Sequence, residues 1–88
     1  MRMAELITRR IEDALAPVSL SVIDESEGHR GHGGWREGGE THFRVQVVAE
    51  AFRGKSRIER HRMVNALAAD AFARGLHALA VSAKAPGE

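Results

Sequence analysis

The hydrophobic period of this chain changes repeatedly along its 88 residues, and this succession limits the folds open to it. Near the start, apolar residues recur at helical spacing, which predicts an amphipathic helix over residues 2–16. The apolar stripe consists of Leu6, Ile7, Ile11, Ala14 and Leu15. Pro17 cannot continue the helical hydrogen bonds, so the helix ends there. Val18, Leu20 and Val22 then alternate with serines, which predicts a strand with one buried face.

Residues 26–39 follow neither period. Six of the nine glycines lie in this stretch, together with His29, His32 and Trp35. We expect residues 27–39 to form a flexible loop between two strands of a single domain that spans residues 1–88. Alternation resumes after the loop, where we expect Phe43, Val45 and Val47 to face the core. The intervening side chains, His42, Arg44 and Gln46, are expected to point outward.

A second helix has clear start and stop signals. Ser56 and Glu59 have the spacing of a capping box, with Ser56 at the N-cap. An apolar stripe follows to about Arg74, and Gly75 is the expected C-cap glycine. The stripe consists of Ile58, Val64, Leu67, Ala68, Ala71 and Phe72. A last short strand has Leu79, Val81 and Ala83 on one face.

The predicted order is therefore α-β-β-α-β. The first two strands can pair antiparallel, and the long helix can cross over so that the third strand pairs parallel. We expect an α+β sandwich, in which two helices cover one face of a three-stranded mixed sheet.

Composition excludes several classes of protein. The chain has no cysteine, which excludes disulfides, Cys-based zinc modules and a cysteine nucleophile. No apolar run is long enough for a membrane span, and no signal peptide is visible, so we expect a cytoplasmic protein. The net charge of +1 is too small for a global nucleic-acid footprint.

Five histidines are the most informative polar residues. His29 and His32 in the loop are either solvated or metal ligands, because neutral imidazole is a common ligand. His77 has the parity of Leu79 and Val81, which favours a half-buried histidine at a strand end. Strand ends are nevertheless where functional residues collect. His61 is expected to border the helix–sheet interface in a packing role, and His42 to be solvated.

A basic stretch precedes and opens the second helix. It contains Arg53, Lys55, Arg57, Arg60 and Arg62, offset only by Glu59, for a local charge of +4. Cations oppose the helix dipole at this end, so helix stability does not explain them. They form either a solvated face or a site for phosphate or another anion.

The acidic residues after the first strand do not indicate an enzyme. Asp24, Glu25 and Glu27 have no nucleophile or oxyanion donor that the sequence pairs with them, so we expect no catalytic residues. Trp35 is interpreted either as an anchor for a partner or as a cover over the sheet edge.

Several motifs together resemble BolA-like proteins over essentially the whole chain. They are Asp24-Glu25-Ser26, Thr41-His42-Phe43, Phe52 with Gly54, Arg60-His61-Arg62, and His77-Ala78-Leu79. The resemblance implies a fold related to the class II KH domain, which matches the order derived above. It also implies a heterodimer with a monothiol glutaredoxin and a role in iron–sulfur trafficking or iron regulation. Alone, the chain is expected to be a monomer or weak homodimer without a cofactor.

The resemblance further implies a shared [2Fe–2S] cluster, for which the glutaredoxin and glutathione supply thiolates. The family's C-terminal ligand histidine falls on His77, and its loop ligand on His29, with His32 as the alternative. Histidine in place of thiolate on one iron is the Rieske-type pattern, which raises the reduction potential.

The family is also described as containing transcriptional regulators of stress and morphology. DNA is therefore an alternative partner, through the KH-like fold and the basic stretch 53–62. Against this, a KH domain clamps the backbone with a Gly-x-x-Gly loop, whereas this turn has Gly54 alone.

Overall fold

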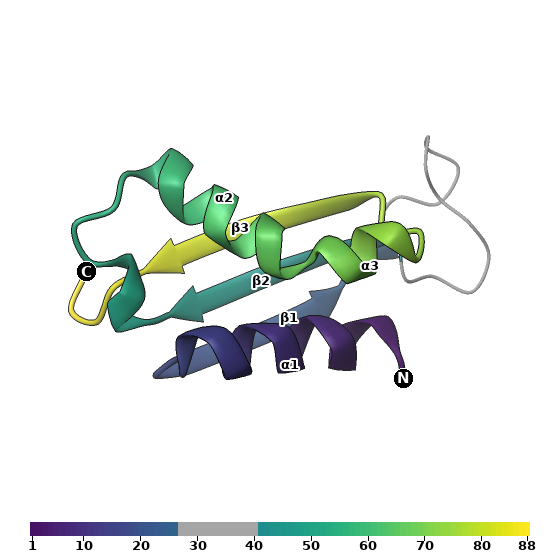
Figure 1. The fold of residues 1–88 in the computed structure, drawn as a ribbon, viewed down its shortest axis with the longest axis horizontal. Helices are drawn as coiled ribbons and strands as arrows, with labels where there is room; N and C mark the ends of the chain where they lie inside the picture. The colour runs from purple at the N-terminus through teal and green to yellow at the C-terminus, as the bar shows by residue number, and fades with distance from the viewer. Residues whose placement is uncertain (27–40) are drawn as a thin grey trace.

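A computed structural model describes residues 1–26 and 41–88 of the chain. Three helices, three strands and a short 3-10 helix follow one another in these two ranges. In chain order they are α1 (Met3–Leu15), β1 (Ser19–Asp24), β2 (His42–Val48), the 3-10 helix η2 (Glu50–Phe52), α2 (Arg57–Leu67), α3 (Ala69–Ala73) and β3 (Ala78–Lys84). Figure 1 shows the strands as a sheet with the helices laid along it.

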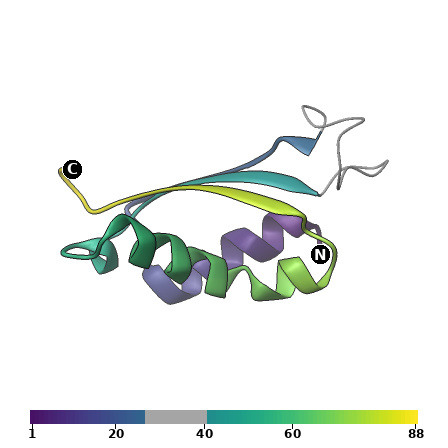
Figure 2. The ribbon, with the colours of Figure 1, turned by 90° about the horizontal axis from the view of Figure 1, so that it is seen from above.

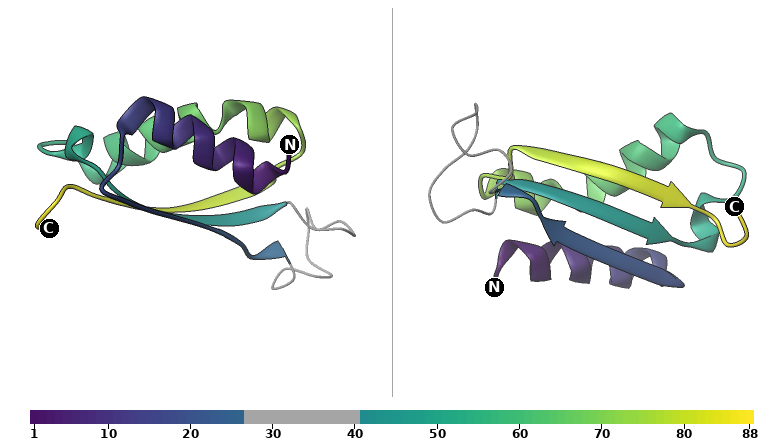
Figure 3. Two further views of the ribbon diagram at one scale, coloured as in Figure 1. Left: turned by 90° about the horizontal axis from the view of Figure 1, so that it is seen from below. Right: turned by 180° about the vertical axis from the view of Figure 1, so that it is seen from behind.

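The sheet has the predicted topology. Its order is β1-β2-β3, with β1 antiparallel and β3 parallel to the central strand β2. In register, Val22 of β1 and Val81 of β3 both lie beside Val45 of β2. All the helices lie on one face of the sheet, as Figures 2 and 3 show from above, below and behind. The expected α+β sandwich with a mixed three-stranded sheet is confirmed.

The core lies between the helices and the covered face of the sheet. On α1 the fully buried residues follow an i, i+4 row of Met3, Ile7 and Ile11. Below them, β2 contributes Phe43, Val45 and Val47, all at most 2% exposed, as the alternation predicted. The core is completed by Phe52, Val64, Ala71 and Leu76.

The predicted single helix over residues 56–74 is wrong, because it is interrupted at Ala68. This residue has φ −91° and ψ 9°, and its amide donates to the carbonyls of both Val64 and Asn65 at 3.1 Å. Ala71 of α3 is buried, whereas the neighbouring Phe72, which the predicted stripe also included, is 38% exposed. The capping box at Ser56 and Glu59 is confirmed by both of its hydrogen bonds, of 2.8 and 3.1 Å.

Some expected core positions are exposed. Ile58 is 64% exposed because Arg60, two positions further along α2, takes the place toward β3, and residues two apart do not share a helix face. Val18 is 73% exposed, since β1 begins only at Ser19. Ala14 is exposed because it lies off the i, i+4 row of α1.

Candidate functional site

His77 lies in the short connection between α3 and β3. Gly75, with φ 114°, turns the chain after α3, and the buried Leu76 donates its amide to the Ala71 carbonyl at 3.0 Å. The amides of His77 and Ala78 both donate to the carbonyl of Thr41, at 2.8 and 3.1 Å. The expectation of a half-buried histidine is wrong: the side chain is exposed while its backbone is fixed.

The two ends of the glycine- and histidine-rich segment are joined beside His77. The buried Ser26 hydroxyl accepts hydrogen bonds from the amides of Thr41 at 3.0 Å and His42 at 3.2 Å. The amide of Ser26 donates in turn to an Asp24 carboxylate oxygen at 2.8 Å. The Thr41 carbonyl also accepts the hydrogen bond from the His77 amide. Ser26 and Thr41, the residues on either side of the segment 27–40, therefore both lie near the exposed imidazole of His77. His29, His32 and Trp35 lie outside the described residues.

His42 differs from its prediction. It was expected to be solvated but is only 5% exposed. Its Nδ1 lies 2.9 Å from the Thr41 hydroxyl, and its ring centroid lies 5.2 Å from that of His77 at an angle of 52°. Strand alternation correctly assigns His42 to the face of the sheet that has no helices. It does not reveal that the distant His77 packs there and helps to bury the ring. The contact restricts the His77 ring on one side.

The donor set near His77 is too small to hold a metal by itself. Among residues 1–26 and 41–88, no three His, Asp or Glu side chains gather at metal-binding distance. An exposed imidazole is a suitable single ligand. Any metal or cluster at His77 would therefore need donors from the segment 27–40 or from another molecule.

The two described acidic residues at the end of β1 have structural partners. Asp24 binds the Ser26 amide, and Glu25 pairs with Arg44 at 3.0 Å on the surface. Glu27 lies outside the described residues. The two described carboxylates thus stabilise the end of β1.

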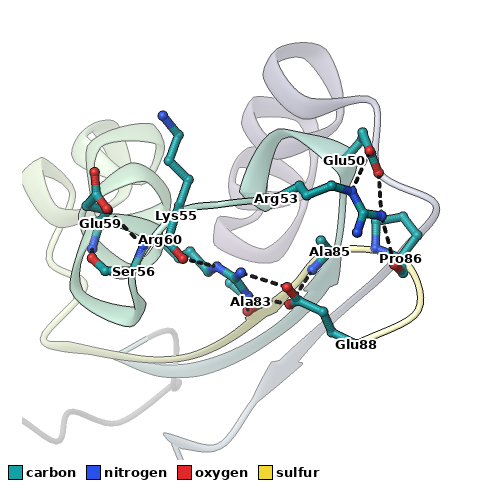
Figure 4. Close-up of polar contacts among 10 residues, drawn as sticks. All are labelled: Glu50, Arg53, Lys55, Ser56, Glu59, Arg60, Ala83, Ala85, Pro86 and Glu88. Atoms are coloured by element: carbon teal, nitrogen blue, oxygen red, sulfur yellow. Dashed lines mark hydrogen bonds and ion pairs between the residues drawn. The ribbon is translucent and has the colours of Figure 1, made fainter.

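The basic stretch is partly neutralised by contacts that the sequence does not reveal (Figure 4). Arg53 pairs with Glu50 and donates to the Pro86 carbonyl at 2.8 Å. Arg60 donates through both terminal nitrogens to the carboxylate of Glu88, one contact measuring 2.9 Å. The hydrogen bonds from Arg60, together with that from the Ala85 amide, lower the pKa of the Glu88 carboxyl to about 2.

A groove of about 580 Å³ runs between α2 and β3 beside these contacts. Its lining residues are Lys55, Arg57, Arg60, His61, Val81, Ser82, Ala83, Lys84 and Glu88. His61 therefore borders the helix–sheet interface as expected, and it is exposed. Lys84 and Glu88 also line this groove, although they lie outside the basic stretch 53–62.

The position of Glu88 had a recognisable signal. Residues 85–88 form a turn in which the Glu88 amide donates to the Ala85 carbonyl at 3.2 Å and Gly87 has φ 88°. Pro followed by Gly at the two central positions is typical of a type II turn. The sequence Ala-Pro-Gly-Glu could thus have predicted a turn after β3, although not the contact of Glu88 with Arg60.

Fold and site together define a class of protein. The chain is a small α+β domain whose exposed histidine lies at one end of a mixed sheet, beside the ends of a glycine-rich segment, and whose cationic groove lies between α2 and β3. It has no cysteine. Within the two described ranges, the helices are all too short or too polar to cross a bilayer.

This chain belongs to the BolA-like protein family, whose model matches residues 11–88. It is 46% identical to an uncharacterized protein in the cobS 5' region of Sinorhizobium sp, covering all of this chain and 96% of that one. It is 40% identical to the DNA-binding transcriptional regulator BolA of Vibrio cholerae, over 88% of this chain and 69% of the regulator.

The fold occurs in plant proteins as well. The solved structure of BolA1 from Arabidopsis thaliana superposes with a TM-score of 0.88 at 33% identity, covering 100% of this chain and 96% of that one. The chain is also 44% identical to the SufE-like protein 1 of the same plant, but it spans only 23% of that protein. None of these relatives is named for an enzymatic activity, and one of them is named as a transcriptional regulator.

Proposed function

We propose that this chain is an adaptor that binds a monothiol glutaredoxin in the cytoplasm and shares a [2Fe–2S] cluster with it. In this proposal His77 is one ligand and His29 is the second, with His32 as the alternative second ligand. The cluster is cargo that is held jointly, and the isolated chain has none.

One observation carries the proposal: an exposed imidazole on a fixed backbone lies where the histidine-containing segment begins and ends. The carbonyl of Thr41 holds His77, and the hydroxyl of Ser26 holds Thr41. This arrangement supports ligation because the exposed imidazole is open to a partner while its main chain is held in place.

The composition determines what the partner must supply. Iron–sulfur clusters are held mainly by thiolates, and this chain has no cysteine. The remaining ligands must therefore come from molecules with thiols, for which a monothiol glutaredoxin and glutathione are suitable. Imidazole nitrogen binds a metal only in its deprotonated form, so protons compete with the cluster for a histidine ligand.

The test is an anaerobic titration of the chain into cluster-loaded monothiol glutaredoxin, followed by visible absorption and circular dichroism. His77→Ala is compared with His61→Ala, which removes another exposed histidine from α2. We expect the wild type and His61→Ala to produce the same new spectrum, and His77→Ala to produce none. Size-exclusion chromatography of the apo proteins should still detect the His77→Ala heterodimer.

The outcomes separate the alternatives. A new spectrum that persists in His77→Ala would remove His77 as a ligand. No spectral change with the wild type would reject cluster sharing altogether. Loss of the fold in His77→Ala, detected by far-UV circular dichroism, would assign the histidine a structural role instead.

DNA binding is the second candidate function. Two observations favour it: the groove between α2 and β3 carries Lys55, Arg57, Arg60 and Lys84, and a relative of 40% identity is named a DNA-binding transcriptional regulator. The turn at Arg53–Ser56 lacks the second glycine of a KH clamp, so affinity would depend on phosphate contacts and on salt. Charge reversal at Arg57 should weaken DNA binding and leave the cluster spectrum unchanged.

A further inference from the structure

The groove between α2 and β3 contains an anion supplied by the chain itself. Four of its lining side chains are cations, and the one carboxylate among its lining residues belongs to Glu88. Glu59, the other acidic residue near this end of α2, is committed to the capping box with Ser56. The groove is therefore a cationic surface in which the chain's own Glu88 carboxylate binds one of the cations, Arg60.

The guanidinium of Arg60 is oriented before any ligand arrives. Its Nε donates to the Lys55 carbonyl at 3.0 Å and one terminal nitrogen donates to the Ala83 carbonyl at 3.1 Å. The side chain is only 14% exposed. The Lys55 carbonyl before α2 and the Ala83 carbonyl in β3 thus fix the planar guanidinium of Arg60. Its two terminal nitrogens face the groove. Such a fork binds two oxygens of a carboxylate or of a phosphate with similar geometry.

Glu88 reaches this fork because of a turn at the end of β3. Residues 85–88 fold back, the Ala85 amide donates to a Glu88 carboxylate oxygen at 2.9 Å, and the Pro86 carbonyl accepts from Arg53. Figure 4 shows the carboxylate facing Arg60 between the turn and α2. With its side chain still 37% exposed, Glu88 can leave without unfolding the core.

We propose that the groove binds backbone phosphates of single-stranded nucleic acid through Arg60, Lys55 and Arg57, and that Glu88 competes with the phosphate for Arg60. This inference rests on the second candidate function and adds its regulation. The Glu88 carboxylate occupies the two positions that phosphate oxygens would take, so nucleic acid must displace it. The wild-type chain consequently binds more weakly than its cations alone would allow.

The experiment compares Glu88→Gln with Glu12→Gln, which makes the same change of net charge on the exposed surface of α1. Binding to a fluorescein-labelled oligonucleotide of about 12 nucleotides is measured by anisotropy across a salt series. The wild type must break the Arg60–Glu88 pair before Arg60 can bind phosphate, whereas Glu88→Gln has no such pair to break. We therefore expect Glu88→Gln to bind up to about fivefold tighter at low salt, with the gain shrinking as salt screens the pair.

Several results would overturn the proposal, and they are distinguishable. Equal gains in oligonucleotide affinity for Glu88→Gln and Glu12→Gln would show that only the change in net charge matters. That result would reject the competition by Glu88 but would leave DNA binding as a function. No binding by any of the three proteins would reject both DNA binding and the competition. A gain confined to Glu88→Gln, and lost when Arg60→Gln is added, supports the proposal. Thermal melts of each variant establish that the compared proteins are folded.

Discussion

Replacing Ser26 by alanine tests the junction on which the candidate ligand site depends. The Ser26 side chain is 2% exposed, and its hydroxyl accepts hydrogen bonds from two backbone amides, those of Thr41 and His42. The variant leaves both amides without this acceptor in a buried place. Each lost acceptor costs about 1–3 kcal/mol, so the loss of both should lower the unfolding free energy by about 2–6 kcal/mol. At about 4–8 °C per kcal/mol for a domain of this size, the melting temperature would fall by at least about 8 °C.

Urea unfolding and amide hydrogen exchange measure this effect directly. Ser82→Ala is the matched control, because Ser82 is an exposed serine of β3. Exchange should accelerate at Thr41 and His42, and also at His77, whose amide is held by the Thr41 carbonyl. A loss of less than about 0.5 kcal/mol, equal to that of an ordinary surface change, would refute the argument. Unchanged exchange at His77 would show that the ligand position does not depend on Ser26.

Two further expectations concern the opposite end of the sheet. The pKa of Glu88 is about 2 in the fold, below its ordinary value of 4.5, so its contribution to stability is present above that value and is lost as the pH falls toward 2. Melting temperatures measured between pH 6 and pH 2 should therefore fall more steeply for the wild type than for Glu88→Gln; parallel curves would contradict the assignment. Ser56→Ala removes the N-cap of α2 and should cost about 1 kcal/mol in urea unfolding, whereas Ser56→Asp should restore most of it. Equal losses of unfolding free energy in Ser56→Ala and Ser56→Asp would mean that the side-chain oxygen that accepts from the Glu59 amide is not what stabilises the helix.

The order and pairing of the elements could be predicted because their signals are local. The proline after α1, the capping box before α2 and the alternation around Val45 each act over a few residues. The interruption at Ala68 has no such signal, since alanine favours helix and the break depends on how α3 packs. The exposure of Ile58 is likewise a tertiary effect, because Arg60 takes the inward position.

The candidate site was predictable only in part. The position of His77 between α3 and β3 followed from Gly75 and from the alternation of the last strand. Its contact with His42 spans 35 positions of sequence and depends on parallel pairing and side-chain packing together. The neutralisation of Arg60 by Glu88 likewise joins residues 28 positions apart. Counting charges along the stretch 53–62 therefore overestimated the free positive charge.

The hydrogen bonds at Ser26 have a practical consequence for protein engineering. The Ser26 hydroxyl accepts hydrogen bonds directly from residues 41 and 42. These bonds hold the end of β1 beside the start of β2, whatever sequence connects residues 26 and 41. Lengthening a connection costs little once its ends are fixed, about 0.6 kcal/mol for each doubling. The interval between residues 26 and 41 is thus a natural insertion point, where a foreign peptide or a fluorescent reporter can be added near His77 while His29 and His32 are kept.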